Sequence, residues 1–287
     1  MFEGFTRQQI TTQETTINLV RGGCGSPILL LHGYPQTHVC WHRVAPILAE
    51  RFTVVCPDLR GYGDSAKPPS DPEHLTYSKR LMAQDQVEMM QRIGFREFAV
   101  VGHDRGARVA HRMALDSAEN ITKLALLDII PTSTAFANVN KEMATAAFNW
   151  FFSIQPDGLP ERLIGAEPAF YVRWILDHWC GTKGALAVEA VAEYHRCFDA
   201  AAIRATCEEF RAAATIDLIH DAADQEHKIS CPTLLLWSAT SMWATYDMLE
   251  VWRSRAEDVQ GAALDCGHFL PEENPERTAA ELIRFLS

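Results

Sequence analysis

Short apolar runs, each nearly continuous, recur along the first part of the chain. Four of them precede residue 130, at residues 27–33, 52–58, 97–104 and 123–129, and each is rich in valine, isoleucine and leucine. A strand that is buried on both faces has such a continuous run, whereas a strand with one face in solvent alternates apolar and polar residues. The runs therefore predict strands of a parallel sheet that is covered by helices on both sides.

Helical spacing appears between these runs and again at the end of the chain. Across residues 77–95 the apolar side chains recur at roughly a helical period, and the segment ends at Gly94, a residue typical of helix ends. Residues 231–238 and 261–268 predict two late strands, and residues 275–287 predict a closing helix.

The middle of the chain has a different pattern. Residues 131–225 are helical in spacing, poor in strand signals and rich in aromatic side chains. We interpret this segment as a helical lid inserted into a sheet domain, since such insertions commonly close over active sites. The expected organisation is a first core part at 1–130, the lid at 131–225 and a second core part at 226–287.

Composition and charge narrow the possible partners. The chain has 287 residues, of which 47% are hydrophobic, so one alternating strand–helix unit can bury a sizeable core. Its formal net charge of −11 argues against a nucleic-acid partner and against an anionic membrane surface. An anionic substrate would therefore have to be captured by local cations.

Neither the N-terminus nor the cysteines indicate export. Residues 1–16 lack a basic-then-apolar signal pattern, and no apolar run approaches the roughly 20 residues that span a bilayer. The eight cysteines are scattered without a CxxC pair, so we expect reduced thiols and no metal site. The prediction is a cytoplasmic globular protein without a membrane partner.

The motif GHDRG at residues 102–106 is the first candidate for chemistry. It fits Gly-x-nucleophile-x-Gly, it follows a predicted strand and it opens a predicted helix, which is the context of a nucleophile elbow. Small neighbours allow the sharp turn that exposes the central side chain. Asp104 stands in the nucleophile position; the alternative is that it only caps the helix.

Two further residues complete a catalytic triad in chain order. His268 lies between the last predicted strand and the closing helix, and Asp128 ends the strand of residues 123–129. Asp265 is the alternative acid, and either member could instead play a structural role. The backbone N–H groups of Tyr34, in the HGYP motif, and of Arg105 are expected to form an anion-stabilising hole.

This order of nucleophile, acid and histidine is the one found in the α/β-hydrolase fold. The predicted fold class is therefore α/β, with a mostly parallel sheet flanked by helices. We expect the helical lid to be inserted after the sixth core strand.

An aspartate nucleophile indicates a particular reaction. When a carboxylate attacks an alkyl carbon it forms an ester, which water can later hydrolyse, whereas a serine would form a stable ether. Asp104 therefore implies displacement at an sp³ carbon with a halide or an epoxide oxygen as leaving group. His268, oriented by Asp128, would activate the water for ester hydrolysis.

Two arginines beside the nucleophile narrow the substrate. Arg105 and Arg108 lie three residues apart and share one helix face. Cations in the first turn of a helix oppose its dipole, so a compensating anion is expected nearby. A small substrate carboxylate held by both guanidinium groups would supply it. The alternative is ion pairing of the arginines with acidic neighbours.

With these motifs in place, the sequence resembles the fluoroacetate and haloacetate dehalogenases. The resemblance runs from LLLHGYPQTHVCWHRVAP through GHDRGARVAHRMALD to GHFLPEENP, and the H-D-R-G-x-R signature is its most specific part. It implies that Asp104 is the nucleophile, His268 the base and Asp128 its partner. It also implies that Arg105 and Arg108 hold a small halogenated carboxylate, that no cofactor or metal is needed, and that the protein is a homodimer.

The lid departs from that family pattern. Defluorinating members carry a His-Trp pair and a tyrosine whose donors point at the halide, where this chain has Asn149, Trp150 and Phe210. Phe210 donates nothing, and fluoride depends most on such donors as charge develops on it. We therefore predict a preference for chloro- or bromoacetate over fluoroacetate. The alternative for Trp150 and Phe210 is lid packing. Trp179 could also line the pocket, but we interpret it as structural.

Three other functions remain open on the sequence alone. An epoxide hydrolase shares the Asp-His-Asp apparatus but needs lid tyrosines, and neither Tyr171 nor Tyr194 stands where the alignment expects a donor. A neutral haloalkane substrate gives no reason for paired arginines. A receptor that binds a ligand without turnover would not need an intact triad.

Overall fold

Eight strands form one sheet in the computed structural model, which describes residues 1–287, and their order is β1-β2-β4-β3-β5-β6-β7-β8. The strands are β1 (Thr6–Thr11), β2 (Thr16–Gly23), β3 (Pro27–Leu31), β4 (Thr53–Pro57), β5 (Phe98–His103), β6 (Ile121–Leu127), β7 (Thr233–Ser238) and β8 (Val259–Leu264). Pairs β1–β2 and β2–β4 are antiparallel, and every other pair is parallel. The predicted fold class is confirmed, and each predicted strand is present.

The N-terminal pair β1 and β2 was not predicted. β1 has the sequence TRQQIT and lies at the edge of the sheet, largely exposed, so it has no continuous apolar run. β2 is buried along Ile17–Val20, but the polar Asn18 interrupts its apolar run. Edge and antiparallel strands are encoded by weaker patterns than buried parallel strands.

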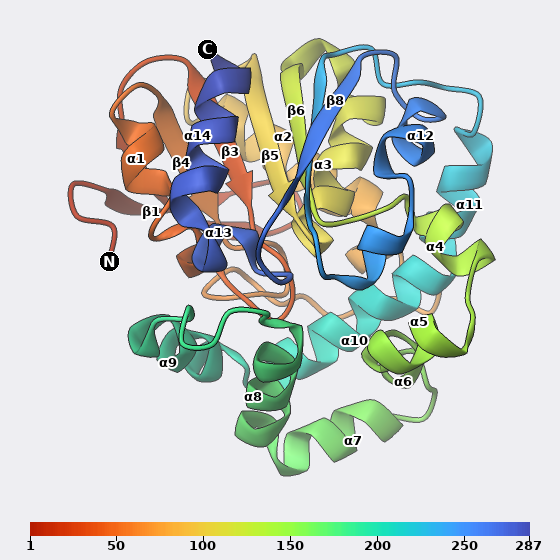
Figure 1. Ribbon diagram of the computed structural model, residues 1–287. Helices are drawn as coiled ribbons and strands as arrows, with labels where there is room; N and C mark the ends of the chain where they lie inside the picture. The colour runs from red at the N-terminus through yellow and green to blue at the C-terminus, as the bar shows by residue number, and fades with distance from the viewer.

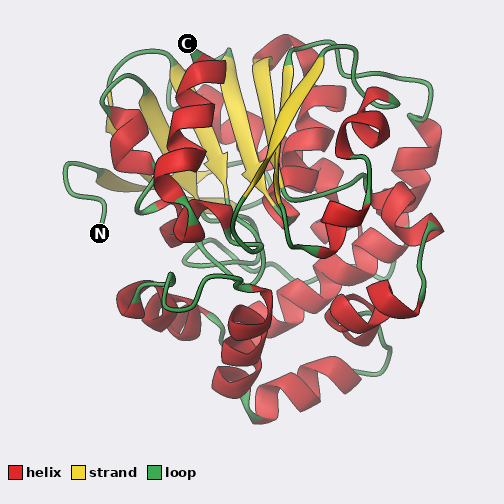
Figure 2. Ribbon diagram, in the orientation of Figure 1, coloured by secondary structure: helices red, strands yellow, loops and turns green.

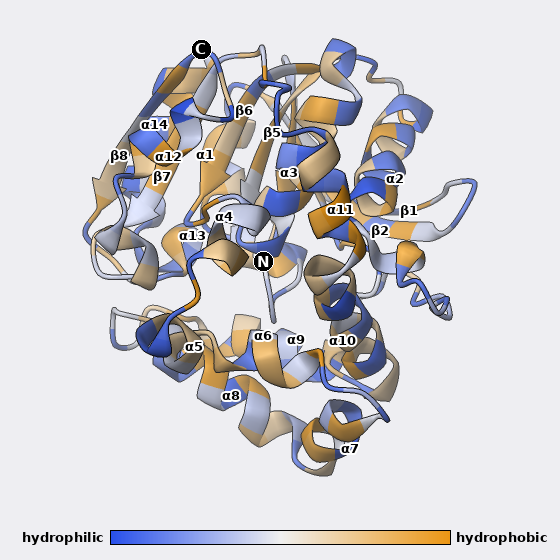
Figure 3. Ribbon diagram, turned by 90° about the vertical axis from the view of Figure 1, so that its right-hand side faces the viewer, coloured by the Kyte–Doolittle hydropathy of each residue, from blue (hydrophilic) through white to orange (hydrophobic).

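Helices cover both faces of the sheet. The core helices are α1 (Ala45–Ala49), α2 (Lys79–Arg92), α3 (Arg105–Asp116), α12 (Met248–Arg253), α13 (Leu270–Glu273) and α14 (Pro275–Leu286). Short 3₁₀ turns occur at η1 (His38–Trp41), η2 (Leu75–Tyr77), η3 (Ala118–Asn120) and η4 (Met242–Thr245). Figure 3 shows α1 and α14 on one side of the strands and α2 and α3 on the other, and α12 packs against α3, with the Trp252 and His111 rings 5.2 Å apart. The predicted helices at 77–95 and 275–287 correspond to α2 and α14.

Between β6 and β7 the chain forms helices only. They are α4 (Thr132–Ala137), α5 (Lys141–Ala146), α6 (Phe148–Ser153), α7 (Leu159–Ala166), α8 (Pro168–Trp179), α9 (Val188–Cys197), α10 (Ala200–Ala214) and α11 (Ile216–Ala223). Helices α5–α10 lie together beyond the ends toward which the strand arrows point (Figures 1 and 2). In open parallel sheets, ligands bind at this carboxyl edge.

The sheet and the helices beyond its edge share one hydrophobic interior. A single cluster of buried apolar residues includes Leu29 of β3, Trp150 of α6 and Ile175 of α8. These helices are therefore packed onto the core by burial of apolar surface. None of the helices has the length and apolar character needed to cross a membrane.

Candidate active site

Asp104 occupies a strained turn between β5 and α3. Its φ is 48° and its ψ is −116°, although it is not glycine, and its side chain makes no capping hydrogen bond. Such backbone conformations cost on the order of 1–3 kcal/mol and persist where the surrounding structure enforces them. The helix-cap alternative is thus not supported, because the carboxylate points away from the helix N–H groups that a cap would bind.

Two glycines flank the turn and make it possible. A Cβ atom at Gly102 would lie 2.5 Å from the Cα of Ala107, and one at Gly106 would lie 2.4 Å from the carbonyl oxygen of His32. Any side chain at either position would therefore force the strand and the helix apart. The spacing GHDRG is a packing requirement of the elbow.

The two oxygens of Asp104 have different surroundings. Oδ1 accepts a hydrogen bond of 2.9 Å from the backbone N–H of Tyr34. Oδ2 lies 3.7 Å from Nε2 of His268. One oxygen is therefore held by the loop after β3, while the other is next to the imidazole.

His268 is oriented by Asp128. Nδ1 of His268 lies 2.7 Å from Oδ2 of Asp128, and the other oxygen of Asp128 accepts 2.9 Å bonds from Ser238 N and Ser241 Oγ. Burial lowers the pKa of His268, but the hydrogen bond and charge of Asp128 raise it further, so that it ends above its ordinary value. Asp265, the alternative acid, is exposed.

The histidine loop is also tied to the elbow. The ring of His103, the residue before the nucleophile, places Nε2 2.7 Å from the carbonyl oxygen of His268. Burial and the neighbouring His268 lower the pKa of His103 to about 3, so its ring is neutral and this nitrogen donates. The backbone N–H of His268 in turn donates to the carbonyl oxygen of Trp179, at 3.0 Å, in the helical segment.

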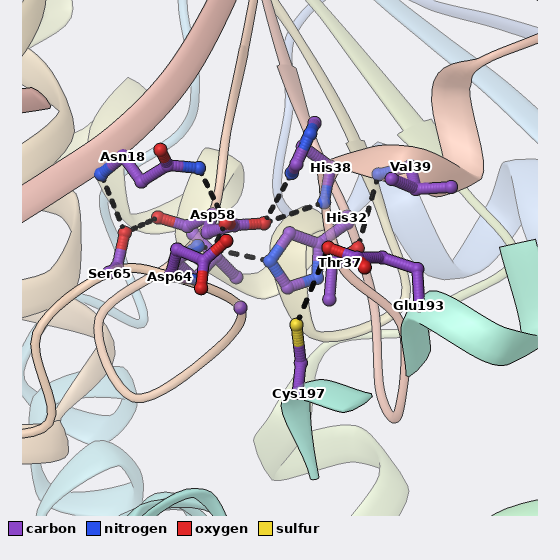
Figure 4. A network of polar contacts seen from close by, with 12 residues as sticks. Asn18, His32, Thr37, His38, Val39, Asp58, Asp64, Ser65, Glu193 and Cys197 are labelled. Carbon is purple, nitrogen blue, oxygen red and sulfur yellow. Dashed lines mark hydrogen bonds and ion pairs between the residues drawn. The ribbon is translucent and has the colours of Figure 1, made fainter. Parts of the chain in front are cut away.

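A buried carboxylate holds the loop that carries Tyr34. Asp58, after β4, accepts 2.9 Å and 2.8 Å bonds from N and Nδ1 of His38 and a 2.8 Å bond from Nδ2 of Asn18 (Figure 4). Burial raises the pKa of this carboxyl, but His38 and His32 outweigh it and hold the pKa well below its usual range. The network explains how a polar residue of β2 helps to shape the site.

Arg105 is paired with an acid from the inserted helices. Its Nε lies 2.9 Å from Oε1 of Glu209 on α10, and its Nη2 donates to the Glu209 carbonyl oxygen at 3.2 Å. Lys79 Nζ lies 2.5 Å from the same Oε1, and the hydroxyl of Tyr62 donates to Oε2. Burial raises the pKa of Glu209, but Arg105 and Lys79 bring it down to about 2. The expected acidic neighbour therefore exists for Arg105.

Part of each guanidinium nevertheless remains without a partner. Nη1 of Arg105 and both Nε and Nη2 of Arg108 are buried and make no hydrogen bond. Nη1 of Arg108 donates to the Ile130 carbonyl and to Thr132 Oγ1, so Arg108 is not paired with an acid. Burial, with Arg105 nearby, lowers its pKa to about 10, which leaves it charged at neutral pH. Buried charged donors without partners are costly unless an anion binds them.

A cavity of about 990 Å³ opens over the triad. Asp104, Asp128 and His268 line it on the core side, and Trp150 lines it on the helical side. The guanidinium groups of Arg105 and Arg108 do not line it but lie against the Trp150 ring, 6.0 Å and 4.8 Å from its centroid. The arrangement places two carboxylates, an imidazole and two buried guanidinium groups beside a largely apolar space.

One group of metal-type ligands occurs outside this site. Oxygen or sulfur atoms of Asp64, Glu193 and Cys197 lie within 4.8 Å of one another (Figure 4). The guanidinium of Arg196 is 2.7 Å from Asp64 and 2.6 Å from Glu193, so these carboxylates already have a cation. We therefore assign no metal to this group.

Comparison with known proteins agrees with this geometry. Residues 26–275 match the model of the alpha/beta hydrolase fold family. The chain is 45% identical to a fluoroacetate dehalogenase of Burkholderia sp, over 100% of this chain and 95% of that protein. The chain belongs to the fluoroacetate/haloacetate dehalogenase family of the α/β-hydrolase superfamily.

The chain is also similar to an epoxide hydrolase and to an α/β hydrolase of known structure. A soluble epoxide hydrolase of Corynebacterium sp. (strain C12) is 32% identical over 97% of this chain and 98% of its own length. The crystal structure of ALR0039, an α/β hydrolase of Nostoc sp PCC 7120, superposes with a TM-score of 0.99 at 57% identity, covering 100% of this chain and 99% of that one. The resemblance predicted from the motifs is confirmed.

The residues that depart from the dehalogenase family pattern lie around the arginines. Phe210 packs edge-on against Tyr34, with ring centroids 5.2 Å apart, and lies 4.3 Å from the Arg105 guanidinium. Asn149 is fully buried, and neither atom of its amide has a hydrogen-bond partner. Trp150 lines the cavity, whereas Asn149 and Phe210 do not.

Sequence reasoning missed two cavity residues that the dehalogenase pattern did not highlight. Tyr171 and Trp179, both on α8, line the cavity, and the Tyr171 hydroxyl and the Trp179 indole N–H are buried without a partner. The structure thus places Trp179 at the cavity, as the sequence left open, and adds Tyr171. Tyr194 instead donates to Glu272 at 3.0 Å. The helical recurrence of aromatic residues along α8 was the available signal.

Proposed function

We propose that this protein hydrolyses the carbon–halogen bond of short 2-haloacids, so that haloacetate and water yield glycolate and halide. The observation that carries the proposal is the position of Asp104 in a strained elbow, with one oxygen facing His268 and two partly unpaired arginines nearby. Membership of the dehalogenase family supports the same reaction.

In the first step Oδ2 of Asp104 attacks the carbon that bears the halogen. The halide leaves with the bonding electron pair, and an ester forms between the substrate carbon and Asp104. Oδ2 suits this role because Oδ1 is already held by the Tyr34 N–H. The backbone thus selects which oxygen attacks.

In the second step water attacks Cγ of Asp104. Nε2 of His268 accepts the proton of the water, and Asp128 stabilises the imidazolium that results. Negative charge develops on Oδ1, which the N–H groups of Tyr34 and Arg105 stabilise. Collapse of this intermediate releases the hydroxy acid and restores the carboxylate.

The substrate carboxylate is bound by the unpaired donors of Arg105 and Arg108. Nη1 of Arg105 and Nε and Nη2 of Arg108 are available for it, and burial strengthens such charge-assisted hydrogen bonds. Fixed guanidinium groups would hold the reacting carbon in one orientation before Asp104. Positioning of this kind contributes much of the rate in displacement reactions.

Chloride and bromide are the proposed leaving groups in preference to fluoride. Phe210 offers no donor, and the Asn149 amide can still donate but differs in placement from the histidine of defluorinating members. Of the three donors expected in defluorinating members, the Trp150 indole is kept, one is displaced and one is lost. Because fluoride relies most on hydrogen bonds as charge develops, its release suffers most from this loss.

The proposal also covers the domain organisation, the cellular location and the oligomeric state of the enzyme. Residues 131–225 act as a lid over the core parts 1–130 and 226–287, supported by the helices that cover the triad. All eight cysteines are free thiols, which supports a reducing cytoplasmic location. The family resemblance supports a homodimer without cofactor or metal.

Halide release from fluoro-, chloro- and bromoacetate tests the proposal. We expect turnover of bromo- and chloroacetate with little or no fluoride release, and no release by the Asp104→Asn variant, whose fold is checked by circular dichroism. Fluoroacetate turnover equal to that of chloroacetate would contradict the halogen preference. Absence of halide from all three substrates would contradict the activity.

Epoxide hydrolysis is the second candidate, favoured by Tyr171. Tyr171 lines the cavity that contains Asp104, and its hydroxyl, beside Tyr34 and Ser153, could protonate an opening epoxide oxygen. Burial raises the pKa of this phenol to about 12, so the hydroxyl stays protonated. Diol formation from styrene oxide, lost in Tyr171→Phe, would establish this activity, whereas no diol from the wild type would exclude it.

A further inference from the structure

The cavity over Asp104 is far larger than the substrate of a haloacetate reaction. Its volume is about 990 Å³, whereas a haloacetate has five non-hydrogen atoms and fills roughly the space of a few water molecules of about 30 Å³ each. Pockets of about 300–1,000 Å³ hold drug-sized ligands. Most of the cavity would stay empty around a haloacetate.

Most of the wall that the inserted helices contribute is apolar, although Glu167 and His178 also line it. Phe148 and Phe152 of α6, Ile164 of α7 and Trp174 of α8 line this part, and the Phe148 and Trp174 rings pack edge to face at 5.0 Å. The charged groups that could bind an anion, Arg105 and Arg108, lie near Trp150 at the other end. The polarity of the site is therefore divided between a cationic corner and an apolar chamber.

Exposed apolar residues continue the chamber to the surface. Leu163 of α7 and Phe170 of α8 line the cavity while being 55% and 67% exposed. Figure 3 shows hydrophobic segments on α7, at the outer side of the helical layer. Contiguous exposed apolar surface in a groove is typical of a ligand-binding site.

We propose that the preferred substrates are 2-halocarboxylates with an extended apolar substituent on the halogen-bearing carbon. This inference rests on the proposed dehalogenase function and names its substrate class. The carboxylate binds Arg105 and Arg108, the halogen-bearing carbon meets Asp104, and the substituent lies in the chamber toward Leu163. The balanced reaction converts R–CHX–COO⁻ and water into R–CHOH–COO⁻, halide and a proton.

A homologous series of substrates tests the chamber. 2-Bromopropionate and 2-bromohexanoate react at the same kind of secondary carbon, so the chemical step is matched and only the alkyl length differs. Each methylene buried in an apolar site contributes about fourfold to kcat/KM. We expect 2-bromohexanoate to exceed 2-bromopropionate by at least about tenfold, with each enantiomer assayed separately.

The outcomes separate this inference from the proposed function. Bromide release from bromoacetate or 2-bromopropionate without any gain for 2-bromohexanoate would overturn the chamber while leaving the dehalogenase intact. No bromide from any of the three would overturn the dehalogenase itself. A gain that grows with alkyl length supports both.

Two substitutions on α7 test whether the longer alkyl substituent binds in the chamber. Leu163→Asp places a carboxylate in the chamber wall, whereas Leu159→Asp places one on the same helix at a side chain that is 47% exposed and does not line the cavity. We expect Leu163→Asp to reduce the hexanoate-to-propionate ratio by about fivefold and Leu159→Asp to leave it unchanged. Equal ratios in the two variants would overturn the assignment.

A second variant fills the chamber. Ile164→Trp adds volume on the cavity side of α7, and it should reduce kcat/KM for 2-bromohexanoate about tenfold more than for 2-bromopropionate. Both substrates are measured on the same folded preparation, so a loss of stability cannot imitate the change in ratio. An unchanged ratio would contradict occupation of this chamber by the substituent.

Discussion

Nε of Arg105 lies 2.9 Å from Oε1 of Glu209, and both side chains are almost completely buried. Arg105 follows Asp104 and begins α3, whereas Glu209 belongs to α10 among the inserted helices. One ion pair therefore joins the two layers and orients an arginine that we expect to bind substrate. Packing of the inserted helices and preparation of the site depend on the same contact.

Replacing Glu209 tests this connection. Glu209→Gln removes the charge between Arg105 and Lys79, and loss of one partner from a buried ion pair costs about 3–5 kcal/mol. We expect the free energy of unfolding in urea to fall by about 3 kcal/mol. KM for bromoacetate should rise about tenfold, because Arg105 is no longer held toward the substrate.

The neighbouring residue provides the control. Glu208 lies on the same helix and pairs with Arg211, but its side chain is 20% exposed. Glu208→Gln should change the unfolding free energy by less than about 1 kcal/mol. Equal effects of the two substitutions on KM would refute a positioning role for Glu209.

Replacing His268 should allow ester formation on Asp104 but block hydrolysis of that ester. In His268→Asn the attack by Asp104 remains possible, but no imidazole accepts the proton of the hydrolytic water. We expect one equivalent of bromide per enzyme followed by arrest, with the added mass of the ester on the peptide that contains Asp104. Continuous turnover, measured by halide release together with mass spectrometry, would rule out His268 as the base.

The pH dependence of ester hydrolysis should report on His268. Although burial acts to lower it, Asp128 raises the pKa of His268 above its ordinary value. As pH falls through that pKa, the imidazole becomes protonated and can no longer act as base, so kcat decreases on the acid side.

Asp128→Asn removes the interaction that raises this pKa. The acid limb of the pH–rate profile of this variant should therefore lie at lower pH than that of the wild type. Its plateau rate should be about 10³–10⁴-fold lower, because the imidazole loses its orienting partner. Single-turnover rates of ester hydrolysis between pH 5 and 9 measure both quantities. An acid limb that stays in place would show that another group controls the profile.

Phe210 offers a test of halogen preference. Its ring lies 4.3 Å from the Arg105 guanidinium, so Phe210→Tyr adds a hydroxyl near the proposed carboxylate-binding arginines without changing the packed ring. We expect the ratio of fluoroacetate to chloroacetate kcat/KM to rise about tenfold, since a donor aimed at developing charge contributes up to a few kcal/mol. A fluoride electrode measures the first rate, and Phe210→Leu serves as the variant without a donor. No change in the ratio would place the limit on defluorination elsewhere.

Most of the fold could be predicted because buried parallel strands have a local signature. The strands β3 to β7 each carry a nearly continuous apolar run, so their positions follow from short stretches of sequence, whereas the edge strand β8 keeps only the short run Ala262–Leu264. β1 and β2 escaped this reasoning because edge exposure and Asn18 break the run. The role of Asn18, as a donor to Asp58, depends on a residue forty positions away and has no local pattern.

The triad was predictable for a similar reason. Asp104 and Asp128 directly follow β5 and β6, and His268 lies in the loop after β8; in a parallel sheet those strand ends share one edge. Chain order and local motifs therefore suffice to bring them together. Tyr171 and Trp179 lie on a helix whose aromatic residues could face the core or the cavity, and periodicity does not distinguish the two.

The sequence by itself determined the reaction type, because an aspartate in a glycine-flanked elbow is a local feature whose chemistry follows from the side chain. It also determined the sheet, because apolar runs are local. Only the tertiary structure decided that Glu209 pairs with Arg105 across 104 residues, and that α6, α7 and α8 enclose an apolar chamber. Ion pairs and cavities between layers arise from packing of distant segments, and their geometry appears only when those segments meet.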